Sequence, residues 1–260
     1  MFDEHARAIR TAGHLARNAA DTRHRIRHRP ELERALAWDD LIAPADGRQV
    51  ISENGAARIL DAAGLPVAAG RLATTTDEAV RAAGAIGWPV AIKGISAAVT
   101  HRAAAGLVAL NVDSPEAVAR IDRTFRARAA ASGVTLDGIW IQRMVSGAVE
   151  LLVTAFRDRE FGVMVGCGLG GGATELIDDV VLARAPIHAE GAVDLMGRLR
   201  TVRRLPDLLS SRQREMAAGF VARFSAIVAT APWPSFTFEI NPLKVGTEDM
   251  AAVDALLIVD

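Results

Sequence analysis

Residues 87–93 read GWPVAIK, and this stretch decides the class of fold. A short apolar run that ends in a lysine predicts a buried strand, since such strands are about four to eight residues long. Helical patterns with capping residues in front precede it, one at 52–63 and one from Thr76 to about Ile86. Outward from this stretch the chain alternates between strand and helix, which is typical of α/β or α+β domains.

The alternation continues toward the C-terminus. Further strands are expected at 107–112, 139–144, 149–156, 162–166, 236–240 and 252–259, and further helices at 114–130 and 211–229. The 260 residues are enough for one large domain or for one domain of two lobes.

Composition and charge exclude several classes of protein. Thirty basic residues face 31 acidic ones, so the net charge does not favour a nucleic-acid partner. The one cysteine, Cys167, excludes an internal disulfide and a cysteine-based zinc site, and it fits a reducing cytoplasm. No apolar run of about 18 residues occurs and the N-terminus is charged, so we expect neither a membrane span nor a signal peptide. We therefore expect a cytoplasmic protein.

Residues 1–49 differ from the remainder of the chain. Arginine and histidine are dense from Arg17 to Arg34, and the apolar residues there support only a loose helical stripe. A basic arm for RNA is one interpretation, but no aromatic residues interleave the charges for base stacking. We therefore favour a solvated helix or one that docks on another subunit, followed by a linker at 44–47 (PADG).

Two features indicate phosphate binding. Lys93 ends its strand, where the ammonium can reach a phosphate while the stem stays packed, although a surface lysine is the ordinary alternative. In a chain rich in arginine the only other lysine is Lys244, which makes each lysine more informative. Residues 166–172 (GCGLGGG) contain five glycines, whose free backbone N–H groups can cradle phosphate or form a flexible turn. Their spacing matches neither a Walker A loop nor a dinucleotide fingerprint.

A third feature indicates a magnesium site. Glu239 and Asn241 point to the same face of a strand, and Asp254 on the next strand can join them. Carboxylate and amide oxygens suit Mg²⁺, which takes few protein ligands together with phosphates and water. A polar strand end that faces solvent is the alternative.

The lysine, the glycine loop and the strand with Glu239 and Asn241 follow one another along the chain in this order. In this respect residues 50–260 resemble the ATP-grasp domain of ADP-forming acyl-CoA synthetases. This is the acetate–CoA ligase (ADP-forming) family, related to the β subunit of succinyl-CoA synthetase. The motifs that carry the resemblance are Gly87–Lys93, Thr100-His-Arg102 with Gly106, Ile141–Met144 with Glu150-Leu, Phe161-Gly162, Gly168-Leu-Gly-Gly171, Glu175-Leu with Asp179, and Glu239-Ile-Asn-Pro-Leu243 with Asp254. The resemblance implies an α/β ATP-grasp fold of two lobes, about 50–140 and 141–260, with nucleotide bound between them.

The resemblance also implies roles for residues that hold the nucleotide. Lys93 resembles the lysine that contacts ATP phosphates. Gln142, Arg143 and Met144 lie in a segment similar to the hinge between lobes, where backbone groups hold adenine. Glu150 matches a carboxylate suited to the ribose hydroxyls.

Further roles concern the phosphates and the metal. Gly170 and Gly171 belong to the glycine loop, which resembles the segment near the phosphoryl acceptor and is expected to bind nucleotide. Asn241 and Asp254 resemble the Mg²⁺ ligands. Glu239 is expected beside them as a catalytic residue that faces the metal or a phosphohistidine.

His101 resembles a histidine that, in two-subunit acetate enzymes, carries phosphate between sites. The family usually reads His-Lys-Ser-Asp-x-Gly-Gly there, whereas residues 101–107 are HRAAAGL. The segment 201–212 (TVRRLPDLLSSR) also lacks the usual Gly-x-Arg-Gly. These departures bear on the phosphohistidine role of His101 more than on ATP binding.

The resemblance implies a ligase that joins a carboxylic acid to CoA with ATP, giving acyl-CoA, ADP and phosphate through a phosphohistidine. ATP or ADP and Mg²⁺ are the expected cofactors. A CoA-binding domain does not fit in residues 1–50, so we expect a separate CoA-binding subunit as partner. Two alternatives stay open: a stand-alone ATP-grasp carboxylate ligase, and a degenerate, non-catalytic nucleotide-binding or interaction subunit, which the altered His101 segment favours.

Overall fold

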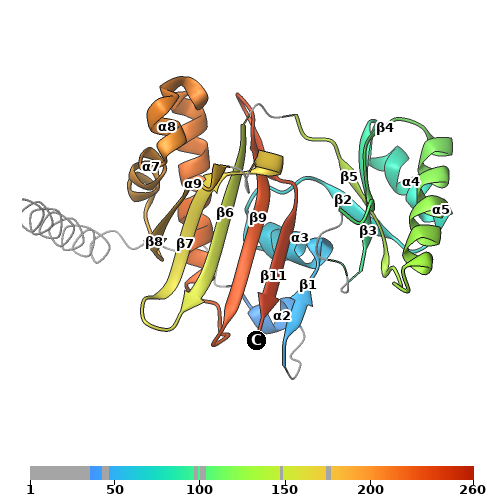
Figure 1. Ribbon diagram of the computed structural model, residues 1–260, viewed down its shortest axis with the longest axis horizontal. Helices are drawn as coiled ribbons and strands as arrows, with labels where there is room; N and C mark the ends of the chain where they lie inside the picture. Colours follow the sequence, from blue (N-terminus) through green and yellow to red (C-terminus); the bar gives the residue numbers. More distant parts are fainter. Residues whose placement is uncertain (1–35, 43–46, 97–98, 100–103, 147–148, 174–176) are drawn as a thin grey trace, which may run out of the picture.

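The computed structural model describes residues 36–42, 47–96, 99, 104–146, 149–173 and 177–260. These residues form two lobes, each built on an antiparallel sheet (Figure 1). The mixed helix and strand content that the sequence predicts is confirmed. Among the described residues, no helix is both long and apolar enough to cross a membrane.

The larger lobe contains a seven-stranded sheet in the order β1-β11-β9-β6-β7-β8, with β10 paired to β9. Its strands are β1 (Gln49–Ile51), β6 (Val149–Asp158), β7 (Gly162–Leu169), β8 (Val180–Arg184), β9 (Phe236–Val245), β10 (Met250–Ala252) and β11 (Ala255–Val259). Its helices are α2 (Trp38–Leu41), α3 (Glu53–Ala62), α7 (Ala189–Gly197), α8 (Arg200–Arg204) and α9 (Ser211–Val228), with short 3₁₀ turns η1 (Gly171–Ala173) and η2 (Pro206–Leu208).

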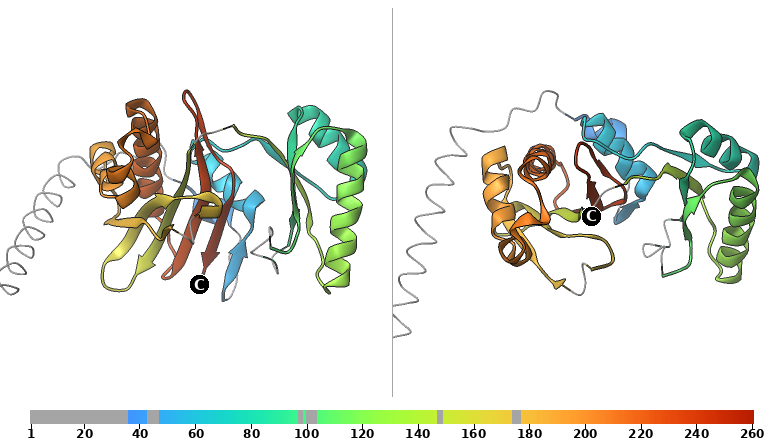
Figure 2. Two further views of the ribbon diagram at one scale, coloured as in Figure 1. Left: turned by 45° about the horizontal axis from the view of Figure 1, so that its top comes forward. Right: turned by 90° about the horizontal axis from the view of Figure 1, so that it is seen from above.

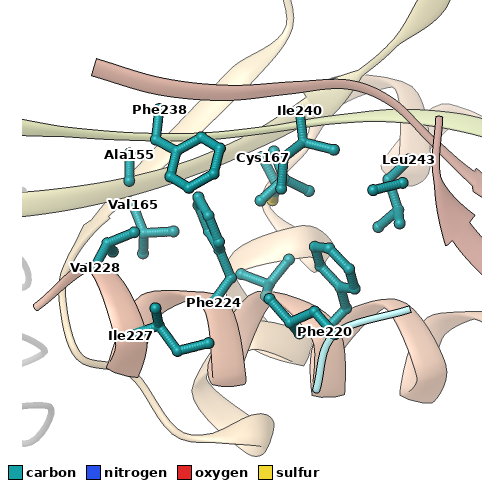
Figure 3. Close-up of a cluster of buried hydrophobic side chains, with 14 of the residues drawn as sticks. Ala155, Val165, Cys167, Phe220, Phe224, Ile227, Val228, Phe238, Ile240 and Leu243 are labelled. Carbon is teal, nitrogen blue, oxygen red and sulfur yellow. The ribbon is translucent and has the colours of Figure 1, made fainter. Parts of the chain in front are cut away.

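One face of this sheet packs on α9 and forms the main hydrophobic core. Phe220 and Phe224 of α9 point at β7 and β9, and the rings of Phe224 and Phe238 meet edge to face at 5.3 Å (Figure 3). Cys167 of β7 lies in the same core, where burial raises the pKa of its thiol to about 12 and the nearby Asp179 adds to the shift. The one cysteine is therefore an inert core residue.

The smaller lobe contains a four-stranded sheet in the order β2-β5-β3-β4. Its strands are β2 (Gly70–Ala73), β3 (Val90–Ile95), β4 (Val108–Val112) and β5 (Gly138–Arg143), and its helices are α4 (Thr76–Ile86) and α5 (Pro115–Ala131). Both helices cover the side of the sheet that faces away from the larger lobe (Figure 2). The other side of the smaller sheet is therefore turned toward the larger lobe.

Local sequence explains where these helices begin. Thr75 and Glu78 form a capping box at α4, in which the Thr75 hydroxyl accepts from the Glu78 amide and the Glu78 carboxylate accepts from the Thr75 amide. The side-chain hydrogen bond from Thr74, with backbone bonds from Thr74 and Thr75, holds the pKa of Glu78 below its usual value. At α5, Ser114 caps the helix and Pro115 occupies the first turn.

The two sheets do not divide the chain as the sequence suggested. A smaller lobe over 50–140 would include β1 and α3, but β1 pairs with β11, and Ile59 and Leu60 of α3 lie in the larger core. The smaller sheet runs instead from Gly70 to Arg143. The chain therefore starts its described part in the larger lobe, crosses to the smaller one, and returns.

Candidate functional site

A cavity of about 560 Å³ lies between the two sheets and has walls from both lobes. The smaller lobe supplies β3, β4 and β5, and the larger lobe supplies β6, η1, β9 and the β10–β11 connection. The predicted site residues that line it are Lys93, Gln142, Arg143, Met144, Glu150, Gly171, Asn241 and Asp254. The structure thus brings together residues that the sequence separates by up to 161 positions, from 93 to 254.

Lys93 reaches this cavity because successive side chains of β3 point to opposite faces of the sheet. Val90 and Ile92 face the core of the smaller lobe, so Lys93 faces the larger lobe. Its Nζ donates to Oε1 of Glu53 over 2.5 Å and to the carbonyl of Val253 over 2.9 Å. The Lys93 side chain is 5% exposed and that of Glu53 1%. The lysine is therefore fixed within the fold and is not a surface lysine.

Sequence reasoning missed Glu53. It is the first residue of α3, directly after Ser52, where an acidic residue is an ordinary feature of a helix N-terminus. Its burial against a lysine 40 residues later depends on how the two lobes meet, and no local pattern signals it.

Gln142 shares the Val253 carbonyl with Lys93. Its Nε2 donates to that oxygen over 3.0 Å. Its Oε1 is buried and accepts no hydrogen bond from the residues that the structure describes. Arg143 and Met144 follow at the end of β5, and the Arg143 amide donates to the carbonyl of Ala69. The predicted hinge segment therefore lies where the chain returns to the larger lobe.

Residues 166–169 of the predicted glycine loop belong to strand β7, so the loop itself starts at Gly170. The Gly170 amide donates to the Glu150 carbonyl over 2.8 Å, and a Cβ at Gly170 would lie 2.4 Å from the backbone of Leu151. Gly170 therefore packs against β6 and does not line the cavity. Gly171 does line it, with φ of +72°, and its amide donates to Oδ1 of Asn241 over 2.7 Å.

Glu150 stands between Gly171 and a second lysine. Glu150 and Lys244 are opposite each other on β6 and β9, and Lys244 Nζ lies 3.2 Å from Oε1 of Glu150. Lys244 also lines the cavity, so both lysines of the chain do so. The rarity of lysine was visible in the sequence, but Lys244 was not predicted as a site residue.

Asn241 and Asp254 are neighbours through the backbone, since the Asn241 amide donates to the Asp254 carbonyl over 2.9 Å. Asp254 lies in the connection between β10 and β11, not on a strand as expected. The partners of β6 step from Leu243 to Ile240, so β9 holds one extra residue at Asn241-Pro242.

Glu239 does not line the cavity with these two residues. It is exposed on β9, opposite Thr154 of β6 and Leu256 of β11. Of the three oxygen ligands expected together, only Asn241 and Asp254 line the cavity, and Glu239 lies outside it.

Asn241 and Asp254 fit a magnesium ion that is bound mainly by phosphates. Mg²⁺ typically takes one or two protein carboxylates plus substrate phosphates and water. The described residues hold no cluster of three or more His, Cys, Asp or Glu side chains that would hold a metal alone. Lys93 and Lys244 each pair with a glutamate but still place an ammonium group at the cavity, which suits a polyanion that brings its own metal ion.

Other predicted residues lie elsewhere. His101 and Glu175 lie outside the described residues. Asp179 is buried and caps the start of α8, where its carboxylate accepts from the amides of Arg200 and Thr201 and from the Thr201 hydroxyl. Burial raises the pKa of Asp179, but the hydrogen bonds from Thr201 and Arg200 outweigh it and leave the pKa below its usual value. Asp179 therefore has a structural task in the larger lobe.

A family model described as an ATP-grasp domain matches residues 42–259. The chain belongs to the ATP-grasp family. This membership confirms the two-lobed ATP-grasp fold that the sequence predicted. Within the family, the curated relatives include ADP-forming CoA ligases, as the motifs indicated.

The β subunit of acetate–CoA ligase (ADP-forming) I from Pyrococcus furiosus is 31% identical over 83% of this chain and 94% of its own length. Acetate–CoA ligase (ADP-forming) I from Archaeoglobus fulgidus is 30% identical over 88% of this chain, which spans only 33% of that longer protein.

Among solved structures, acetyl-coenzyme A synthetase 1 of Candidatus Korarchaeum cryptofilum, in complex with coenzyme A and Ca-AMPCP, is 28% identical. It has a TM-score of 0.76 over 83% of this chain and 95% of that one. In another structure of that enzyme, with Mg-AMPPCP, a phosphohistidine segment points towards the nucleotide binding site.

Proposed function

We propose that this chain is the nucleotide-binding subunit of an ADP-forming acyl-CoA synthetase. With a separate CoA-binding subunit, it would convert a carboxylic acid, CoA and ATP into acyl-CoA, ADP and phosphate. The convergence of eight predicted nucleotide and metal residues on one cavity carries this proposal. The match to the Pyrococcus furiosus β subunit, which extends over 94% of that subunit's length, supports the proposal.

The cavity residues divide the binding of nucleotide among them. Lys93 meets the phosphates, Glu150 meets the ribose hydroxyls, and Gln142 to Met144 meet the base. Asn241 and Asp254 would hold Mg²⁺, which supplies positive charge to the transferred phosphoryl group when it is bound. Positioning and neutralisation of charge are most of what phosphoryl transfer asks of a protein.

The acceptor of the phosphoryl group is proposed to be a histidine, with His101 as a candidate in this chain and Glu239 as a residue that faces the phosphohistidine. In the Korarchaeum enzyme a phosphohistidine segment reaches towards the nucleotide site, which supports the presence of such a step. The Pyrococcus relative is named as a β subunit, which supports a separate partner subunit here. A cytoplasmic location is part of the proposal.

Calorimetric titration of the purified chain with ADP and ATP, with and without Mg²⁺, tests the proposal first. We expect Mg²⁺-dependent binding that weakens in the Lys93→Ala and Asn241→Ala variants. The second step adds candidate CoA-binding chains and follows loss of the CoA thiol with ATP and a panel of carboxylic acids. Binding without turnover in every such mixture would support the degenerate, non-catalytic subunit, and no binding of either nucleotide would contradict the proposal.

A further inference from the structure

We infer that Glu53 is a positioning residue for the nucleotide phosphates, which acts by holding the Lys93 ammonium in place from inside the fold. The inference rests on the proposed nucleotide-binding function. It assigns a task to a carboxylate that lies outside the cavity lining and that no sequence motif singled out.

The first argument is the burial of the pair. The Lys93 and Glu53 side chains are 5% and 1% exposed, so water does not compete for their 2.5 Å contact. Exposed ion pairs hold a side chain only weakly, whereas a buried pair that loses one partner leaves an uncompensated charge inside the protein. Glu53 therefore restricts Lys93 far more than a surface acid would.

The second argument is the geometry of the ammonium group. Lysine has three N–H donors, and among the described residues Glu53 and the Val253 carbonyl accept two of them. The three bonds lie at tetrahedral angles, so fixing two of them fixes the direction of the third. That third donor is left for a ligand in the cavity that Lys93 lines.

The third argument is the origin of the two acceptors. Lys93 is on β3 of the smaller lobe, but Glu53 and Val253 both belong to the larger lobe, to α3 and to the β10–β11 connection. The ammonium is thus positioned relative to the larger lobe, which carries Gly171, Asn241 and the other residues expected around the phosphates. Glu53 aligns the phosphate-binding group of one lobe with the rest of the site on the other.

Calorimetry with ADP and with adenosine tests this inference on the full chain. The variants are Glu53→Gln, Lys93→Met and the double variant, with Glu116→Gln, an exposed residue of α5 outside the cavity, as the matched control. We expect Glu53→Gln to weaken ADP binding about 10- to 100-fold, the range for a lost hydrogen bond to a charged group. Adenosine, which has no phosphate, is expected to bind as it does to the wild-type chain. In the Lys93→Met background, Glu53→Gln is expected to change ADP affinity little, because Glu53 acts through Lys93.

A purely structural role of Glu53 predicts different results. ADP affinity that is unchanged or tighter in Glu53→Gln, an equal loss of adenosine affinity, or additive losses in the double variant would each overturn the inference. Should Glu53→Gln not fold, Glu53→Asp keeps the charge with a shorter reach and is expected to lose part of the ADP affinity and none of the adenosine affinity. If the wild-type chain binds no ADP, the proposed function and this inference are overturned together. If the wild-type chain binds ADP and the Glu53→Gln variant binds it equally well, the inference alone is overturned.

Discussion

The amide of Gly171 donates a hydrogen bond to Oδ1 of Asn241 over 2.7 Å, which ties the glycine loop to strand β9 across 70 residues of sequence. The loop was predicted to bind phosphate, and the asparagine was predicted to bind a metal ion. Their contact links the two features, because the Gly171 amide holds in place the side chain that would meet the metal.

Asn241→Ala is expected to weaken ATP binding about tenfold in the presence of Mg²⁺ and much less in its absence, the size of one charge-assisted contact. The variant removes the proposed metal ligand and the acceptor for the Gly171 amide at once. Calorimetry at fixed ATP with varied Mg²⁺ measures this. Asn241→Asp keeps an acceptor oxygen and serves as the matched variant; equal losses with and without Mg²⁺ would speak against a metal role.

Gly171→Ala is expected to destabilise the chain by about 1–2 kcal/mol, because alanine is strained at a φ of +72°. A Cβ there would also lie 1.8 Å from Oε2 of Glu150, so that side chain would have to move away from Lys244. Gly172→Ala is the matched control, since a Cβ there meets no atom within 4 Å. Urea unfolding of both variants measures the difference, and equal stabilities would contradict the positional argument.

Lys244→Met is expected to weaken ADP binding about three- to tenfold at low salt and less at high salt, since partly exposed charges are screened. The variant removes a positive charge from the cavity and leaves the carboxylate of Glu150 facing a polyanion. Titrations at two ionic strengths check this, with Lys244→Arg as the variant that keeps the charge. An affinity that does not respond to salt would indicate that Lys244 only pairs with Glu150.

Much of the fold was predictable because its signals are local. The helix at Thr76–Ile86 has the predicted bounds, since the Thr75–Glu78 capping box lies within four residues. Lys93 was found because it closes a short apolar run in a chain with few lysines, although strand β3 continues past it to Ile95. The cavity residues were predicted from motifs that follow one another along the chain as they do in the family. The structure adds that these residues line one cavity.

The misses involve contacts that no local pattern encodes. Strand β9 was expected to end at Ile240, but it continues to Val245. Pro242 lacks the N–H that a ladder needs, and the extra residue at Asn241-Pro242 lets the strand pass it. Strand β8 was not predicted. It is an edge strand whose exposed positions hold Val180 and Leu182, so burial does not mark one face as the core.

Asp179→Asn is expected to lower the free energy of unfolding by roughly 2 kcal/mol at neutral pH, because hydrogen bonds to a buried carboxylate from Thr201 and Arg200 are weakened. The folded-state pKa of Asp179 is lowered, so its contribution is present above the unfolded-state value of about 3.9 and is lost as the pH falls through the folded-state value. The difference between wild type and variant should therefore shrink as the pH falls below about 4. Urea unfolding at a series of pH values measures it, with Asp178→Asn, an exposed neighbour, as the control. A difference that stays constant down to the acid limit of folding would show that Asp179 stabilises α8 through shape and not through its charge.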